Sequence, residues 1–425
     1  MAKKIYLAIV VLAVFYSVSI NAAPRIRTIS FEGNLVTQES LLLREMYVAV
    51  GDELDEAKVQ TSVQAIMDLG LFKSVHYYLA EDYIGIDPEK NVVDLVILLE
   101  EKFYLLIIPR VRVSDETTTL GMQLRWDNVF GLNHSMNALY EDRGTTAGVH
   151  ETRQRFIYNY PNVNGSRFSM SMRLTHANDV DENEIEGPIN RKDEELALGI
   201  FKWLNPQGRN HGWYAGLGLN YRQRENLSID GSIADDSIDA MVLELGYGYN
   251  KVHEYAYNRG GKAFGYNVDI ADEALGGNSD YVKNVLFYRS YYRFNSRPDD
   301  NLNVQVMFGH ANTDILGDAA FSLGSGDDLR GYDKDRFEGN TLLLMNIEYL
   351  RPMETYPSFR YVYFLDVGNT YAEISDIKHD ALKTGAGIGF RWKLAAFVKV
   401  DLRVDVGYGF ADEDYHISFG TRHIF

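Results

Sequence analysis

The chain has 425 residues, no cysteine and a formal net charge of −18 at pH 7, which excludes disulfide bonds and argues against nucleic acid as a partner. By length alone it would hold about two or three soluble domains. Its 29 tyrosines, 21 phenylalanines and 36 glycines, with few long apolar runs, are instead typical of membrane-spanning β-strands.

Residues 1–22 have the pattern of a secretory signal peptide. Lys3 and Lys4 supply the positive charge, an apolar run extends from Ile5 to Ile20, and Ala22 lies where a signal peptidase would cut. The alternative is a membrane-anchoring helix, for which this run is short. No later stretch reaches about 18 consecutive apolar residues, so the sequence predicts no transmembrane helix in the mature protein.

Residues 23–102 mix helix and strand patterns and are expected to form a small α+β domain. The predicted elements are a strand at 26–34, helices at 38–46 and 56–69, and strands at 74–80 and 92–100. Thr37 is expected to cap the first helix with its hydroxyl group.

The order β-α-α-β-β, with Gly51-Asp-Glu-Leu54 and Leu69-Gly-Leu-Phe-Lys-Ser-Val75, resembles a POTRA (polypeptide-transport-associated) domain. The resemblance implies a sheet edge that a passing polypeptide joins by β-augmentation. The candidate edge is the strand that contains Val75, Tyr77 and Leu79. The alternative is a spacer that holds the rest of the protein at a distance.

From residue 103 to residue 425 the dominant pattern has a period of two. In Val398–Tyr408 every even position is apolar and every odd position is charged or glycine. In an outer-membrane barrel the apolar face is turned to lipid and the polar face lines the lumen. We therefore predict an all-β transmembrane barrel of 16 antiparallel strands, preceded by the α+β domain. The segments are 103–113, 119–127, 134–141, 152–160, 166–175, 193–204, 212–223, 238–249, 259–270, 282–294, 301–311, 341–351, 359–366, 382–393, 397–408 and 415–425.

The connections between these segments fall into two classes. Those after even-numbered strands are short, whereas those after odd-numbered strands include the long segments 176–192 and 312–340. Short turns on one side and long loops on the other are typical of outer-membrane barrels. Residues 312–340 would then form the sixth surface loop.

The loop 312–340 carries Leu329-Arg330-Gly331-Tyr332 near its centre. By strand parity Glu348 and Asp366 face the lumen. A guanidinium group taken out of bulk water needs carboxylate partners. We therefore expect the loop to fold into the lumen, with Arg330 against both carboxylates.

The single POTRA-like module, the 16 strands, and Arg-Gly-Tyr followed by Phe364-x-Asp-x-Gly368 resemble the BamA/TamA superfamily (bacterial surface antigen family). That superfamily includes outer-membrane assembly factors and two-partner-secretion transporters. The resemblance implies that Arg330 anchors the loop tip to the barrel wall, that Gly331 allows a tight backbone and that Tyr332 packs on the wall.

The first and last strands are expected to pair weakly. Pro109 in the first strand cannot donate a hydrogen bond to a ladder, and the last strand contains Gly420. The resemblance implies a seam that opens to admit client strands, and the alternative is a local bend. The terminal Phe425 resembles the signal by which barrel precursors are recognised.

These patterns predict a protein of the bacterial outer membrane, with the POTRA domain in the periplasm, that promotes insertion or translocation of polypeptides. Its partners would be unfolded or partly folded clients, outer-membrane lipid and, as a further possibility, a periplasmic accessory protein. The sequence shows no catalytic arrangement, so we expect no enzyme and no cofactor. His134, His150, His176 and His211 lack ligand spacing, so no metal site is expected either. A passive pore or structural barrel, and a dedicated secretion transporter, remain alternatives.

Overall fold

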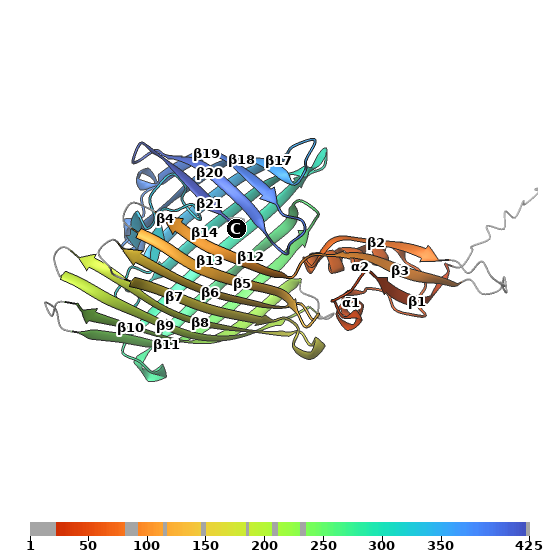
Figure 1. Ribbon diagram of the computed structural model, residues 1–425, viewed down its shortest axis with the longest axis horizontal. Helices are drawn as coiled ribbons and strands as arrows, with labels where there is room; N and C mark the ends of the chain where they lie inside the picture. Colours follow the sequence, from red (N-terminus) through yellow and green to blue (C-terminus); the bar gives the residue numbers. More distant parts are fainter. Residues whose placement is uncertain are drawn as a thin grey trace, which may run out of the picture.

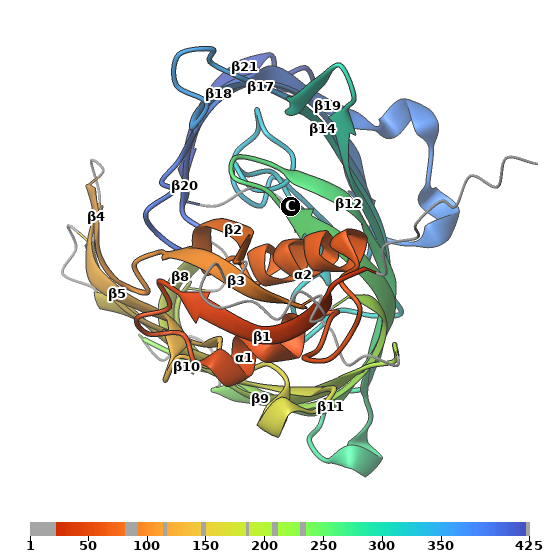
Figure 2. The same cartoon turned by 90° about the vertical axis from the view of Figure 1, so that its right-hand side faces the viewer.

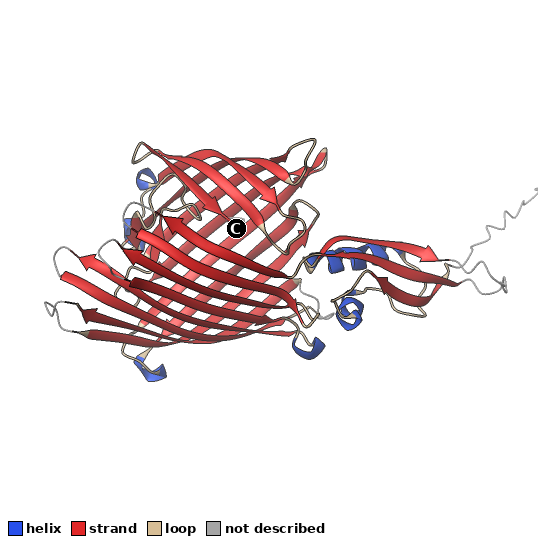
Figure 3. Cartoon of the chain, viewed as in Figure 1, coloured by secondary structure: helices blue, strands red, loops and turns tan. Residues whose placement is uncertain are grey.

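The computed structural model describes residues 23–80, 92–113, 117–145, 150–183, 187–205, 211–229 and 235–421. The predicted signal peptide and Phe425 lie outside these residues. Figure 1 shows a small amino-terminal module beside a large barrel, and Figure 3 shows that the barrel consists almost entirely of strands. None of the described helices is long and apolar enough to cross a membrane.

The module has the predicted order of elements. They are β1 (Arg25–Glu32), α1 (Glu39–Glu45), α2 (Glu56–Asp68), β2 (Phe72–Ala80) and β3 (Val92–Glu101). The sheet order is β1-β3-β2, with β1 parallel and β2 antiparallel to β3. Its core contains apolar side chains from both helices and all three strands, including Leu42, Ile66 and Leu95.

The two helices begin differently. The Asp55 carboxylate accepts hydrogen bonds from the amides of Ala57 and Lys58, which caps α2. The expected Thr37 cap of α1 is wrong, because Gln38 is the N-cap residue and no side chain caps it. The Thr37 hydroxyl instead accepts a hydrogen bond from Asn128 Nδ2. Thr37 therefore serves the contact with the barrel.

In the described residues sixteen antiparallel strands form one sheet, as predicted. They are β4 (Leu105–Val113), β5 (Thr117–Val129), β6 (His134–Thr145), β7 (His150–Tyr160), β8 (Phe168–Asn183), β9 (Gly187–Trp203), β10 (Gly212–Ser228), β11 (Asp236–Glu254), β12 (Arg259–Ala271), β13 (Tyr281–Phe294), β14 (Arg297–Ala311), β17 (Thr341–Pro352), β18 (Phe359–Tyr371), β19 (Lys383–Lys393), β20 (Asp401–Gly409) and β21 (Asp414–Gly420). Two short strands, β15 (Phe321–Leu323) and β16 (Phe337–Gly339), pair with each other between β14 and β17.

The period-two pattern separates the two faces of the wall. Leu217, Leu219, Tyr361 and Tyr363 are exposed on the outside, as expected for lipid-facing positions. Their neighbours on the opposite face include the buried Val362 and Phe364. The alternation thus fixes which side chains enter the lumen.

Many predicted strand ends differ from the observed ones by a few residues, and two of these differences change the interpretation of a segment. The segment 176–192 is not a long loop, because β8 continues to Asn183 and β9 begins at Gly187. The strand predicted at 397–408 begins only at Asp401. Val398 and Val400 are buried, and Val398 packs into the core of the amino-terminal module instead of facing lipid.

Candidate functional site in the lumen and at the seam

The connection between β14 and β17, residues 312–340, lies inside the ring of strands (Figure 2). The β15–β16 hairpin forms its base. Its buried apolar side chains pack against Leu342 and Leu344 on the inner wall. The apolar members of the connection are Ala320, Phe321, Leu323, Leu329 and Tyr332. Burial of this surface gives the connection a core of its own.

Arg330 is in direct contact with Asp366 of β18. Its Nε donates to Asp366 Oδ2 at 2.6 Å and its Nη2 to Oδ1 at 2.8 Å, which is the bidentate geometry that arginine and carboxylate favour. Its backbone amide also donates to Asp366 Oδ2 at 3.1 Å. The guanidinium group lies 3.5 Å from the centre of the Phe364 ring, within the range of a cation–π contact.

Beyond β18, the ionic contacts around Arg330 extend to three further strands. Arg330 Nη1 donates to Glu348 Oε1 of β17 at 2.7 Å. Arg391 of β19 donates to the same oxygen at 2.9 Å and also pairs with Asp405 of β20. Asp405 lies 3.7 Å from Arg330 Nη1. We name Arg330, Glu348, Asp366, Arg391 and Asp405 the lumen charge cluster.

The side chains of the lumen charge cluster are at most 1% exposed. Each charge has therefore lost most of its hydration and depends on its partners. Removing one member of such a group leaves an uncompensated charge, which costs roughly 3–5 kcal/mol. Asn346 completes the contacts by donating to Asp366 Oδ1 and to the carbonyl oxygen of Asp328.

Gly331 has φ +93°, a conformation that favours glycine. Its backbone lies directly on β20, where a Cβ atom built on Gly331 would be 2.6 Å from the amide nitrogen of Gly409. The facing positions of the wall are also glycines, and a Cβ at Gly385 would lie 1.9 Å from the Arg330 carbonyl oxygen. A Cβ at Gly409 would lie 2.1 Å from the Gly331 carbonyl oxygen. Backbone therefore packs on backbone.

Tyr332 and Gly368 are two further residues that the sequence predicted for this site. The Tyr332 hydroxyl donates to the carbonyl oxygen of Thr384 at 2.7 Å and accepts from the amide of Ala411 at 3.1 Å. Gly368 lies in β18, where a Cβ atom would be 2.6 Å from the Leu343 carbonyl oxygen and 3.2 Å from Leu323 of the connection.

The connection also reaches the last two strands of the sheet. Asp327 pairs with Arg403 of β20, and Arg336 pairs with Asp412 of the β20–β21 turn. Gly326 lies against Ser418 of β21, since a Cβ at Gly326 would be 2.4 Å from the Ser418 Cβ. The connection thus contacts β20 and β21, and β21 forms one border of the seam.

The seam lies between β4 and β21. In residues 105–113 and 414–420, β4 is paired only with β5, and β21 only with β20. Pro109 lies in register with Met122 of β5, and Gly420 lies in register with Arg403 of β20. Phe425, the third residue predicted for the seam, is outside the described residues.

The start of β4 is held by a different part of the wall. The Phe103 amide donates to the carbonyl oxygen of Ala396 at 2.7 Å, and its ring lies 5.6 Å from that of Phe397. Both partners belong to the turn between β19 and β20. The link between the module and the barrel is therefore fixed beside the seam without using β21.

The predicted client edge, β2, is an outer strand of the module's sheet. The side chains of Val75, Tyr77 and Leu79 face the module's core. The exposed side chains are those of His76 and Tyr78. A polypeptide added to β2 would therefore bind to its backbone edge. The three predicted residues would hold β2 in place through their packing on the core.

Sequence reasoning missed Arg391, Asp405 and the glycines of the wall. The odd-numbered charged positions of β20 were the available signal for Asp405. It also missed the contact of Asp68 with His211 and His253, which joins the module to the barrel. Within the part of the chain that the structure describes, these three residues form a group of histidines and a carboxylate close enough together to hold a metal ion.

The Omp85 superfamily domain matches residues 128–424, and a POTRA domain of the type described as surface antigen variable number repeat matches residues 24–102. The chain is 23% identical over 403 residues to the outer membrane protein assembly factor BamA of Nitratidesulfovibrio vulgaris. That match covers 87% of this chain and 47% of the relative, so the chain spans about half the length of the relative.

Solved structures share the fold. CdiB from Escherichia coli has a TM-score of 0.64 at 15% identity, with 94% of this chain and 75% of that chain covered. BamA from Haemophilus ducreyi lacking POTRA domains 1–3 has a TM-score of 0.53 at 15% identity, with 93% and 84% covered. The resemblance found in the sequence is thereby confirmed. The chain belongs to the Omp85 superfamily and is an outer-membrane β-barrel with an amino-terminal POTRA domain in the periplasm.

Proposed function

We propose that the protein promotes insertion of client polypeptides into the outer membrane, and that its free strand edges are the working surfaces. The observation that carries this proposal is the seam. Over the described residues, β4 and β21 each pair with only one neighbour, so their outer backbone groups are available to a client strand. A folding client would supply the free energy, since each new strand pair removes unsatisfied backbone groups from lipid.

The first contact in this proposal is made in the periplasm. The backbone edge of β2, at Val75–Leu79, is open to an extended segment, which can add to the sheet as a further strand. The exposed ring of Tyr78 would contact alternate side chains of that segment. Unfolded or partly folded clients offer extended segments of this kind.

In the proposal the connection 312–340 keeps one border of the seam in place. Arg330 holds the connection to β17 and β18, Gly331 rests on β20, and Gly326 touches β21. The lumen charge cluster would therefore hold the connection in the position from which it supports β20 and β21. If the anchor fails, β20 and β21 lose a support on their lumen side.

The proposed division of the chain is a signal peptide at 1–22, the periplasmic module at 23–102 and the barrel at 103–425. The relative from Nitratidesulfovibrio vulgaris is named an outer membrane protein assembly factor. We therefore propose no enzymatic activity for this chain.

The test is folding of a small client barrel into liposomes that contain the purified protein. Empty liposomes give the uncatalysed rate, and liposomes with the Arg330→Ala protein test the anchor. We expect faster client folding with the wild-type protein and a loss of that acceleration with Arg330→Ala. An unaccelerated client in liposomes that conduct ions would instead favour the pore, and passage of one secreted partner into the liposome would favour the secretion transporter.

A further inference from the structure

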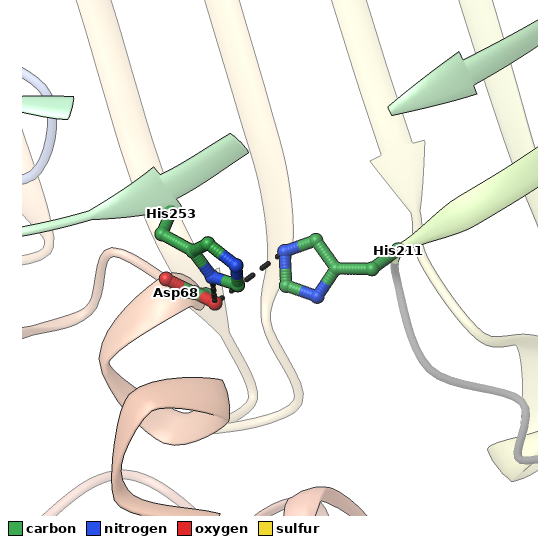
Figure 4. Close-up of side chains that lie close together, drawn as sticks. All are labelled: Asp68, His211 and His253. Carbon is green, nitrogen blue, oxygen red and sulfur yellow. Dashed lines mark hydrogen bonds and ion pairs between the residues drawn. The ribbon is translucent and has the colours of Figure 1, made fainter. Parts of the chain in front are cut away.

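A cluster of ligand-type side chains lies where the module meets the barrel. Asp68 is the last residue of α2, His211 directly precedes β10, and His253 lies in β11 (Figure 4). Their side chains point toward one another from three separate elements. The cluster plays no part in the proposed function described above.

The distances in this cluster are close to those between the ligand atoms of a metal site. Asp68 Oδ2 lies 2.7 Å from His253 Nδ1 and 3.4 Å from His211 Nε2. One ligand atom from each residue lies within 4.8 Å of the others. In a tetrahedral zinc site with bonds of about 2.0–2.1 Å, neighbouring ligand atoms are roughly 3.3 Å apart. The Asp68–His211 pair already has this spacing, and the Asp68–His253 pair would have to open by about 0.6 Å to admit an ion.

The carboxylate is already oriented by its surroundings. Asp68 is 5% exposed, and its second oxygen, Oδ1, accepts hydrogen bonds from the Glu254 amide at 2.8 Å and from Gln64 Nε2 at 2.7 Å. These donors fix the plane of the carboxylate and leave Oδ2 directed at the two imidazoles. Support of this kind is what tunes and orients the ligands of a metal.

The type of donor selects the type of ion. Two imidazole nitrogens and one carboxylate oxygen suit zinc and similar transition metals, whereas magnesium and calcium prefer oxygen ligands. Asp68 and His211 also line a cavity of about 260 Å³, which leaves room for a water molecule as a fourth ligand.

We propose that Asp68, His211 and His253 form a zinc-binding site that clamps α2 to β10 and β11. The ion would bind Asp68 Oδ2, His253 Nδ1 and His211 Nε2. The proton now shared between His253 and Asp68 would move to His253 Nε2, and the contact of His211 Nε2 with the Val252 carbonyl oxygen would be given up. Because all three elements must be in place, zinc would stabilise the docked module over the undocked one.

The test is a titration of the full-length protein, purified without a histidine tag and stripped with EDTA, with Co²⁺ followed by absorption spectroscopy. The chain has no cysteine, so the tetrahedral Co²⁺ bands would come from nitrogen and oxygen ligands alone. We expect about one equivalent of Co²⁺ that Zn²⁺ displaces. The His211→Ala and His253→Asn proteins should bind at least about tenfold more weakly.

The His253→Asn change separates the two roles of that residue, because the asparagine amide can still donate to Asp68 while the imidazole ligand is gone. His176→Ala is the matched control, since His176 is a half-exposed histidine beside Glu194 outside the cluster. Heat-modifiable migration on gels verifies that each protein is folded. If the wild-type protein takes up no Co²⁺ that Zn²⁺ displaces, or if both cluster variants bind as tightly as His176→Ala, the proposal is overturned and the cluster is a hydrogen-bonded contact.

Discussion

At the scale of single residues, Arg330 joins the connection 312–340 to two buried carboxylates of the wall. Arg330→Ala removes the partner of Asp366 and one partner of Glu348, both buried, so we expect a loss of roughly 3–5 kcal/mol in the stability of the loop contact. The measurement is protease cleavage within 312–340 together with the temperature at which the barrel loses its heat-modifiable form. Both should move strongly.

Arg336→Ala is the matched control for that experiment. Arg336 lies in the same connection and pairs with Asp412, but its side chain is 50% exposed. An exposed pair of this kind contributes little to stability, because water screens its charges. Equal effects of the two substitutions would sink the claim that burial makes Arg330 the anchor.

The glycines under the loop tip allow a second prediction. Gly331→Ala adds a Cβ atom at positive φ and also brings it into the backbone of β20. Gly165→Ala adds a Cβ at φ +74° in a turn where nothing lies within 4 Å. Protease sensitivity of 312–340 should rise only with Gly331→Ala. Similar behaviour of both proteins would mean that the close approach to β20 is unimportant.

Strand parity is a local property, so the sequence alone places Glu348 and Asp366 on the lumen face. The rest of the lumen charge cluster depends on register between strands. Arg391 meets Asp405 because β19 and β20 pair as they do, and no local pattern states that pairing. The need for glycine at 385 and 409 likewise arises only from the loop that lies on them, so the sequence alone does not reveal it.

At the scale of elements, the parallel pairing of β1 and β3 is tied by an ion pair with a defined response to pH. Arg27 and Thr28 on β1 donate to Asp94 on β3, and the hydrogen bond from Arg27 lowers the pKa of Asp94 to about 2. The pair therefore contributes its full stabilisation above about pH 4 and loses it as the pH falls toward 2. Partial exposure keeps this contribution below about 1 kcal/mol.

The measurement is urea unfolding of the module at pH 5 and pH 2.5, reported by a fluorophore on a cysteine that replaces His76. The midpoint should fall more between these pH values in the parent protein than in the same protein carrying Asp94→Asn. Equal falls would show that Asp94 is not responsible.

The two boundary differences that change the interpretation of a segment have physical causes. Residues 176–192 are acidic and look like a loop, but β8 and β9 stay paired with each other through Asn183 and Gly187, beyond the point at which the pairing of β7 with β8 ends. Val398 and Val400 continue the alternation of β20, yet both are buried in the turn before it, and Val398 packs into the core of the module. Periodicity describes a strand without showing where it leaves the membrane.

At the scale of the whole molecule, the sequence predicted the barrel and the POTRA domain because both are built from repeated local patterns. It could not predict how they meet. Thr37 with Asn128, and Asp68 with His211 and His253, are contacts between residues far apart in the chain. These contacts hold the module across the mouth of the barrel (Figure 2), from which a client would approach the seam.

If clients use the seam between β4 and β21, a covalent link between these two strands should stop them from folding through it. The most direct measurement is client folding in liposomes that hold a protein with one cysteine in each of these strands, before and after reduction of the disulfide. A disulfide between residues 388 and 406, which are already paired in β19 and β20, is the control for the cross-link itself. We predict no acceleration of client folding with the seam closed, full recovery on reduction, and normal activity of the control. Undiminished acceleration with the seam closed would contradict the account.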